Sequence, residues 1–228
     1  MIIILSGEPG SGKTDRSMLF EEPIKILDME NRDERSRIRN HSDQVIEVIP
    51  MLIKNNHIKD YYQSYLVLKK TVDTILKSDP EFRTLVVDGI SDVRGKYAKA
   101  KWFHDHPKRK NPMPEEWTEI NDTTKQILEP LIDIARDENF NLIFTAQFCD
   151  EYGKVEKLND NGKVIITSEK LGREPNVEDW QSYNMDTHII LEYRKPYYKA
   201  VCIKSIVGCF EENITGKSLY DILIEKGV

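Results

Sequence analysis

An apolar run at the start of the chain leads into an octapeptide that constrains the fold more than any other segment. The run is Ile2-Ile3-Ile4-Leu5, and Gly7–Thr14 matches the pattern G-x-x-x-x-G-K-[ST]. A buried strand, a glycine-rich turn and a helix beginning near Gly12 form a P-loop. Glycines are needed where backbone N–H groups curl around a phosphate, and the positive end of the helix dipole faces the same phosphate. The chain is therefore predicted to bind a nucleotide through its phosphates.

The octapeptide predicts a specific role for its last two residues. We expect Lys13 to supply positive charge to the β- and γ-phosphates and the Thr14 hydroxyl to ligate Mg²⁺. The predicted phosphate cradle consists of Gly7, Glu8, Pro9, Gly10, Ser11, Gly12, Lys13 and Thr14.

A second nucleotide-site signal is the segment Thr84-Leu85-Val86-Val87-Asp88. An apolar strand ending in Asp is typical of the Walker B element, whose carboxylate emerges beside the P-loop and orients Mg²⁺. Gly89 follows, where many P-loop ATPases have the glutamate that activates water. The base must then come from elsewhere, and Glu30, just after the apolar segment Ile24–Asp28, is the best candidate if that strand neighbours the Asp88 strand.

Strand and helix patterns alternate along most of the chain. Continuous apolar runs at 82–88 and 140–146 fit parallel strands that are covered on both faces, and residues 58–76 have helical periodicity. Hairpin patterns follow, around Asn161-Gly162 and Lys195-Pro196, and a helix is expected at 218–226. We predict one α/β domain over residues 1–228, with a mostly parallel sheet flanked by helices and antiparallel strands added near the C-terminus.

The order of these segments resembles that of RecA-like recombination ATPases, most closely the small versions carried by phages and other viruses. The matching segments are Gly7–Thr14, Ile26–Glu30, Leu85–Asp88 and Leu142–Gln147. The resemblance implies a P-loop NTPase that uses ATP and Mg²⁺, with Glu30 as the catalytic base and Gln147 as a sensor of the γ-phosphate. ATP rather than GTP also fits the lack of an N-K-x-D guanine-reading motif in the sequence.

The resemblance further implies a homo-oligomer with ATP at the subunit interfaces. In such proteins a late strand presents cations to the neighbouring subunit's nucleotide, and Lys204 has a similar position. The second basic residue usual in that pattern is absent, because Ser205 and Ile206 follow. Arg194 and Lys195 are the alternative sources of this charge.

Single-stranded DNA is the expected partner, and two segments are candidates for its contact. Residues 99–110 combine basic residues with Trp102 and Phe103, and phosphate contact plus base stacking holds single strands. Residues 148–183 follow Gln147, where RecA-like proteins carry a DNA-contacting loop. This second segment contains Lys154, Lys157, Lys163, Lys170, Arg173, Trp180 and Tyr183. A solvated charged loop is an equally good interpretation of either segment.

Charge and cysteine content narrow the class of protein. The formal net charge of −6 does not indicate a nucleic-acid binder, so any DNA contact requires a local basic patch. Cys149, Cys202 and Cys209 show no C-x-x-C spacing and are expected to be buried thiols. No apolar run approaches a membrane span, and we expect a cytoplasmic protein, in the host cell if the source is viral.

The favoured function is thus a Mg²⁺-dependent ATPase that acts on single-stranded DNA in recombination, replication or repair. One alternative is a nucleoside or nucleotide kinase, in which Lys108-Arg109-Lys110 would form a lid over phosphates. The other is a DNA-translocating packaging or helicase-type motor, which shares the same ATP chemistry.

Overall fold

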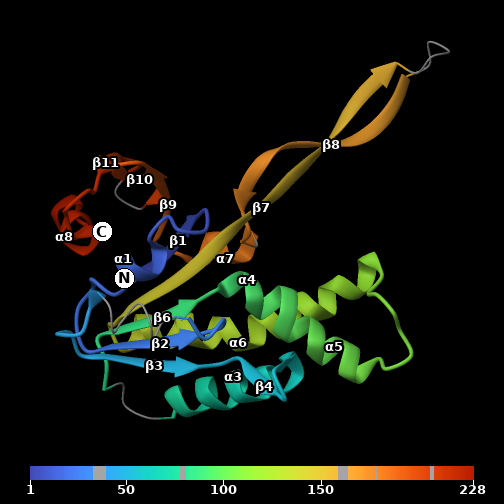
Figure 1. Cartoon of the computed structure of the whole chain (residues 1–228), viewed down its shortest axis with the longest axis horizontal. Helices are drawn as coiled ribbons and strands as arrows, with labels where there is room; N and C mark the ends of the chain where they lie inside the picture. The colour runs from blue at the N-terminus through green and yellow to red at the C-terminus, as the bar shows by residue number, and fades with distance from the viewer. Residues whose placement is uncertain (33–39, 78–80, 159–163, 178, 206–207) are drawn as a thin grey trace.

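The chain is organised around one mostly parallel β-sheet with helices on both faces, as the computed structural model shows (Figure 1). The structure describes residues 1–32, 40–77, 81–158, 164–177, 179–205 and 208–228. Side chains are described for these residues except 152–158, 164–169, 179, 182, 183 and 194. The predicted α/β class, with its parallel core and antiparallel C-terminal strands, is confirmed.

The main sheet runs in the order β11-β10-β9-β1-β7-β6-β2-β3. Its parallel strands are β1 (Ile2–Gly7), β2 (Ile24–Asp28), β3 (Ile46–Pro50), β6 (Thr84–Asp88), β7 (Asn141–Leu158) and β9 (Thr187–Arg194). The antiparallel strands β10 (Tyr197–Ser205) and β11 (Glu211–Asn213) complete one edge. Because β1 lies between β7 and β9, the loop after β1 emerges in the middle of the carboxyl edge, where open α/β sheets bind ligands.

Alternate side chains of the core strands enter two separate hydrophobic cores. Ile2 and Ile4 of β1 face one core, whereas Ile3 and Leu5 face the other, and all four are buried. Since both faces are covered, the strands are apolar at nearly every position, which explains the continuous runs in the sequence.

The larger core packs against a layer of helices. The smaller core packs against helical segments near the two ends of the chain. The helical layer comprises α3 (Tyr61–Ile75), α4 (Ile90–Asp92), the π-helical turn η1 (Val93–Ala98), α5 (Lys99–Asp105), the 3₁₀ turn η2 (Pro114–Glu116) and α6 (Trp117–Asp137). The other face is covered by α1 (Lys13–Ser17), the segment following it and α8 (Leu219–Lys226). The α8 helix is confirmed with its signals: Ser218 caps its N-terminus, and Gly227 ends it in a left-handed conformation with φ of 81°.

Several segments differ from the sequence-based prediction. Residues 58–60 form strand β5 (Ile58–Asp60), which pairs with β4 (Ile53–Asn55) in a small hairpin, so the helix starts later than predicted. Helix α6 contains Pro130 in its interior. Residues 169–183 are not simply loop, because β8 (Val164–Pro175) and α7 (Asp179–Asn184) occupy most of them. Strand propensity was weak there, and pairing with β7 decides the conformation.

The hairpin expected around Asn161-Gly162 is a long two-stranded ribbon. Strands β7 and β8 pair antiparallel from Phe148 opposite Pro175 to Leu158 opposite Val164, and the turn residues 159–163 lie outside the described part. Figure 1 shows the ribbon projecting away from the rest of the fold.

Within the described ranges, no helix combines the length and apolar character needed to cross a bilayer.

Candidate active site

The glycines of the predicted phosphate cradle occupy positions that other residues would disturb. A Cβ on Gly7 would lie 2.5 Å from the Leu191 carbonyl oxygen of the neighbouring strand β9. Gly10 and Gly12 have φ of 81° and 83°, in the left-handed region that favours glycine. The loop therefore turns tightly from β1 into α1, as a P-loop requires.

Lys13 and Ser11 present polar atoms toward the inside of this turn. The Lys13 Nζ donates to the carbonyl oxygens of Gly7 and Glu8, at 2.9 and 3.0 Å. Burial lowers the pKa of Lys13, while the charges of Asp88, Glu8 and Glu30 oppose this shift. The Ser11 hydroxyl oxygen is buried and has no hydrogen-bond partner within the described structure. Lys13 and Ser11 thus offer a cation and a hydroxyl that a phosphate would satisfy, so the cradle fits a nucleotide.

Thr14 and Asp88, the two predicted magnesium ligands, are in direct contact. The Thr14 hydroxyl donates to Asp88 Oδ2 at 3.0 Å. The Thr145 hydroxyl of β7 donates to the other carboxylate oxygen and accepts the Gly89 N–H at 2.9 Å. Thr145 was missed in the sequence analysis, although a hydroxyl within an apolar core strand is a signal that could have revealed it. The Asp88 carboxylate is therefore held in one orientation from two sides.

The structure places Glu30 beside this pair, as the sequence analysis required. Strand β2 is the parallel neighbour of β6, with Asp28 opposite Asp88. Asp28 Oδ1 accepts the Glu30 backbone N–H at 2.9 Å and so directs the chain after β2. The Glu30 carboxylate lies 3.0 Å from Arg32 Nη1 and 3.7 Å from Lys96 Nζ. Neither cation was identified from the sequence. Arg32 is close to Glu30 in the chain, whereas Lys96 comes from the distant η1 turn.

Gln147 also lies next to the phosphate cradle. In the β1–β7 register it is opposite Gly7, and its side chain is half-buried. The strand does not end at Gln147, as the sequence analysis assumed, but continues directly into the β7–β8 ribbon. A side chain at the P-loop is thus joined to the projecting ribbon by one continuous strand.

Lys204 lies near the amino ends of the parallel strands, whereas the P-loop of its own chain lies at their carboxyl ends. It is paired in register with His188 near the start of β9, and its Nζ donates to the Met185 carbonyl oxygen at 2.9 Å. Lys195 follows the carboxyl end of β9, on the P-loop side, and the Arg194 side chain lies outside the described part. A role for Lys204 in a neighbouring subunit stays a prediction.

Two pockets flank the P-loop, and the sequence analysis identified neither. One, of about 200 Å³, is lined by Gly12, Asp15, Arg16, Leu19, Asn40, His41 and Tyr198. In it the Arg16 guanidinium carbon lies 5.3 Å from the centre of the Tyr198 ring. The other, of about 330 Å³, is lined by residues 8–11, Phe148 and residues 190–193. Both can accommodate parts of a ligand that extend from the phosphate cradle.

In residues 99–110, the first segment predicted to contact DNA, fewer side chains are free to contact DNA than the sequence indicates. Trp102 lies within α5, is only 2% exposed and packs with Ala98 and Ile120, so it is not free to stack on a base. Lys101 forms an ion pair with Asp105. The stacking role expected for Trp102 is therefore wrong for this conformation.

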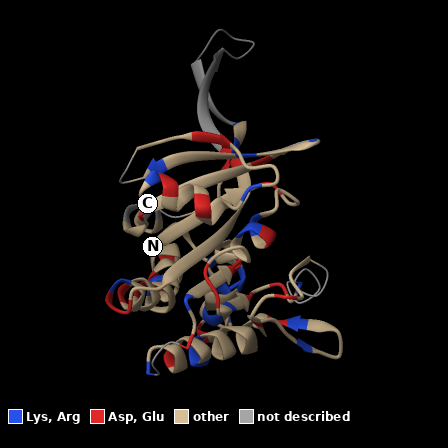
Figure 2. Cartoon of the chain, turned by 90° about the vertical axis from the view of Figure 1, so that its left-hand side faces the viewer, with Lys and Arg blue, Asp and Glu red and all other residues tan. Residues whose placement is uncertain are grey.

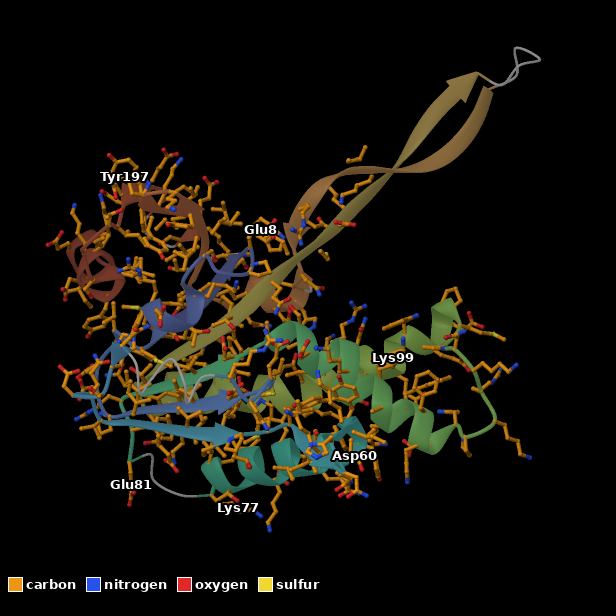
Figure 3. The ribbon with its side chains drawn as sticks, in the orientation of Figure 1. Glu8, Asp60, Lys77, Glu81, Lys99 and Tyr197 are labelled. Carbon is orange, nitrogen blue, oxygen red and sulfur yellow. The ribbon has the colours of Figure 1, made fainter. Side chains whose placement is uncertain are left out.

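In the second segment, two of the described cations are paired within the chain. Lys170 Nζ lies 2.8 Å from Asp150, and Arg173 pairs with Glu8 of the P-loop. Figure 3 shows Glu8 at the foot of the β7–β8 ribbon. Trp180 is half-buried against Lys125. The side chains of Lys154, Lys157, Lys163 and Tyr183 lie outside the described residues.

Within the described part of the chain, no group of three or more His, Cys, Asp or Glu side chains is arranged to hold a metal ion. A nucleotide-bound Mg²⁺ does not require such a group, because phosphate oxygens and water supply most of its ligands. Thr14 and Asp88 fit the remaining positions of such an ion.

The chain matches no family model, and the curated proteins contain no match to it.

Proposed function

We propose that the chain is a Mg²⁺-dependent ATPase of the RecA-like P-loop class that acts on single-stranded DNA. The observation that carries this proposal is the contact between Thr14 and Asp88 at 3.0 Å, beside a tight glycine-rich turn and next to Glu30. A hydroxyl and a carboxylate brought together at the end of a P-loop are the protein ligands that a nucleotide-bound Mg²⁺ takes.

Each part of the site would have its own role in binding and hydrolysing ATP. The turn Gly7–Gly12 would bind the phosphates through its backbone N–H groups, and Lys13 would exchange its carbonyl partners for phosphate oxygens. Thr14 and Asp88 would hold Mg²⁺, which neutralises charge on the phosphates when bound. Tyr198 lies beside Gly12 and borders the pocket of about 200 Å³ that would receive the nucleobase, although its ring already contacts Tyr193 and Arg16.

Glu30 would act as the general base. Its carboxylate is on the strand next to Asp88 and can orient a water molecule and accept its proton. Gln147, opposite Gly7, would report the state of the γ-phosphate to the β7–β8 ribbon. We place ATP at the interface of a head-to-tail homo-oligomer, with a cation from the neighbouring subunit supplied by Lys204 or Lys195.

The decisive experiment is ATP hydrolysis with and without single-stranded DNA, for the wild type and for Glu30→Gln. We expect DNA to stimulate the wild type, and Glu30→Gln to lose about 10²- to 10⁴-fold in kcat while it still binds ATP. Glu225→Gln, an exposed change on α8, is the matched control and should behave as the wild type. If Glu30→Gln hydrolyses ATP normally, Glu30 is not the base.

A kinase is the alternative that the same preparation can test. The segment 108–110 proposed as its lid lies between α5 and α6, at the far end of the helical layer from the P-loop, and Arg109 lies 3.5 Å from Glu116 (Figure 1). Incubation with a panel of nucleoside monophosphates would show phosphate transfer if the chain were a kinase. A translocating motor would instead move on duplex DNA.

A further inference from the structure

A pocket of about 430 Å³ opens directly beside the proposed base. It is lined by Glu30, Asn31, Arg32, Lys54 and Lys59. Three of these five residues are cations and one is an anion, so the lining is net positive on a chain whose formal net charge is −6. The sequence analysis did not single out this group, because its members come from the end of β2 and from the β4–β5 hairpin.

The hairpin brings two of the cations together. Lys54 on β4 is directly opposite Lys59 on β5, and both side chains are exposed. Figure 2 marks basic residues on both strands of this hairpin. Neither lysine has an ion pair or a hydrogen bond to any described residue. Like charges opposite one another destabilise a sheet, and an isolated two-stranded hairpin is marginally stable. A bound anion would remove this repulsion.

Arg32 connects the pocket to the proposed base. Its Nη1 lies 3.0 Å from Glu30 Oε2, and its side chain is 73% exposed. On the other side, Lys96 lies 3.7 Å from Glu30 Oε1 but only 2.5 Å from Asp92. Arg32 is thus the closer partner of Glu30, and it is also the partner that an anion in the pocket can reach.

We propose that this pocket binds the phosphodiester backbone of single-stranded nucleic acid, and that the bound phosphates compete for Arg32 and release Glu30 to activate water. The proposal rests on the proposed ATPase function and supplies the link between strand binding and hydrolysis. Without the nucleic acid, the Glu30 carboxylate is paired with Arg32 and is not free to orient a water molecule. With the strand bound, Arg32 pairs with a phosphate.

The chemistry of the pocket favours a strand over a small phosphorylated acceptor. Lysines are flexible point charges, and the two on the hairpin can contact successive phosphates of a nucleic-acid backbone while Arg32 contacts another. In the same hairpin, the turn residues Asn56 and His57 and the adjacent Ile58 are also exposed. In the two segments first expected to contact DNA, by contrast, some cations form ion pairs with carboxylates of the chain itself. These cations are Lys101, Lys170 and Arg173.

The first test measures binding of fluorescent oligothymidylate without ATP over a series of salt concentrations. Each lysine–phosphate contact on a single strand contributes about 0.7 to the slope of log affinity against log salt. The double variant Lys54→Gln/Lys59→Gln should therefore lose about 1.4 from that slope. The matched control Lys69→Gln/Lys70→Gln removes two exposed charges from α3 and should keep the wild-type slope. Equal slopes for both double variants would overturn the proposal.

The second test measures hydrolysis by Arg32→Gln. Basal ATP hydrolysis without oligonucleotide should rise about two- to fivefold, the range that an exposed ion pair can supply, and the stimulation ratio should fall. No rise in basal hydrolysis would overturn the release of Glu30.

The two tests separate this proposal from the proposed function. A wild type that binds oligothymidylate through Lys54 and Lys59 but hydrolyses no ATP would retain the pocket and refute the ATPase. A wild type that hydrolyses ATP but binds no oligonucleotide would retain the ATPase chemistry and refute both the pocket and the proposed action on single-stranded DNA. The double variant could instead lose binding of a nucleoside monophosphate while it keeps binding of oligothymidylate. That result would assign the pocket to a small phosphate acceptor and overturn the proposal that it binds single-stranded nucleic acid.

Discussion

Asp88 illustrates how single hydroxyl groups shape the candidate site. Thr14 from the P-loop helix and Thr145 from the adjacent strand each donate to one of its carboxylate oxygens. A carboxylate restrained from both sides loses little conformational freedom when it meets a cation. Both threonines therefore act by positioning Asp88, whether or not they also contact a ligand.

His188 leads to a prediction on pH and stability. Its Nε2 lies 2.7 Å from Ser6 Oγ, and burial, with a smaller contribution from the charge of Lys204, lowers the pKa of His188 to about 4 from 6.5. Between pH 6.5 and 4, His188 is protonated in the unfolded chain but stays neutral in the folded chain. The free energy of unfolding should then fall between pH 6.5 and 4 and level off below, with a total loss on the order of 3 kcal/mol from this residue.

The measurement is urea unfolding of the wild type and His188→Gln at several pH values. The variant keeps a hydrogen-bonding side chain that does not titrate, so its stability should depend less steeply on pH in this window. Parallel pH profiles for the two proteins would contradict the shifted pKa of His188.

At the scale of elements, Asp60 joins the β4–β5 hairpin to helix α3. One of its carboxylate oxygens accepts the Gln63 N–H as the helix cap, at 3.0 Å, and the other accepts Asn55 Nδ2, also at 3.0 Å. Figure 3 shows Asp60 at the start of α3. The element that carries Lys54 and Lys59 is thus attached to the helical layer partly through one side chain.

Replacing Asp60 with alanine should therefore weaken both elements. We expect a loss of about 1 kcal/mol in the free energy of unfolding, typical of a removed helix cap, measured by urea denaturation. Asp73→Ala, an exposed change in the last turn of the same helix and away from the Asp60 cap, should stay within about 0.5 kcal/mol of the wild type. If the two variants lose equal stability, the cap of Asp60 contributes nothing.

At the scale of the whole molecule, the β7–β8 ribbon is separate from the two hydrophobic cores. It projects from the fold in Figure 1, and the core residues of β7 all precede Gln147. Among its described side chains, the part of the ribbon after Gln147 contributes to neither core.

Shortening the ribbon should leave the fold intact. Replacement of residues 152–170 by a short turn should change the Tm by less than about 3 °C, because none of the described core residues is removed. Differential scanning calorimetry of the full and shortened chains is the measurement. A larger drop in Tm would mean that the ribbon stabilises the folded body.

Much of the site follows from the sequence because its signals are local. Glycines at Gly10 and Gly12 encode a left-handed turn, and an apolar run ending in Asp88 encodes a buried strand with a carboxylate at its end. The mostly parallel sheet follows from the same runs, since only strands covered on both faces are apolar throughout.

What the tertiary structure alone decided is which of these local elements became neighbours. The pairing of β2 with β6 brought Glu30 to Asp88, and the β6–β7 pairing brought Thr145 to the same carboxylate. The folding of β4 against β5 placed Lys54 and Lys59 beside Arg32. Strand order and register depend on packing between residues far apart in the chain, and periodicity within one segment carries no information about its neighbour. For that reason the sequence by itself determined the glycine-rich turn, whereas the contacts around Glu30 exist only in the folded molecule.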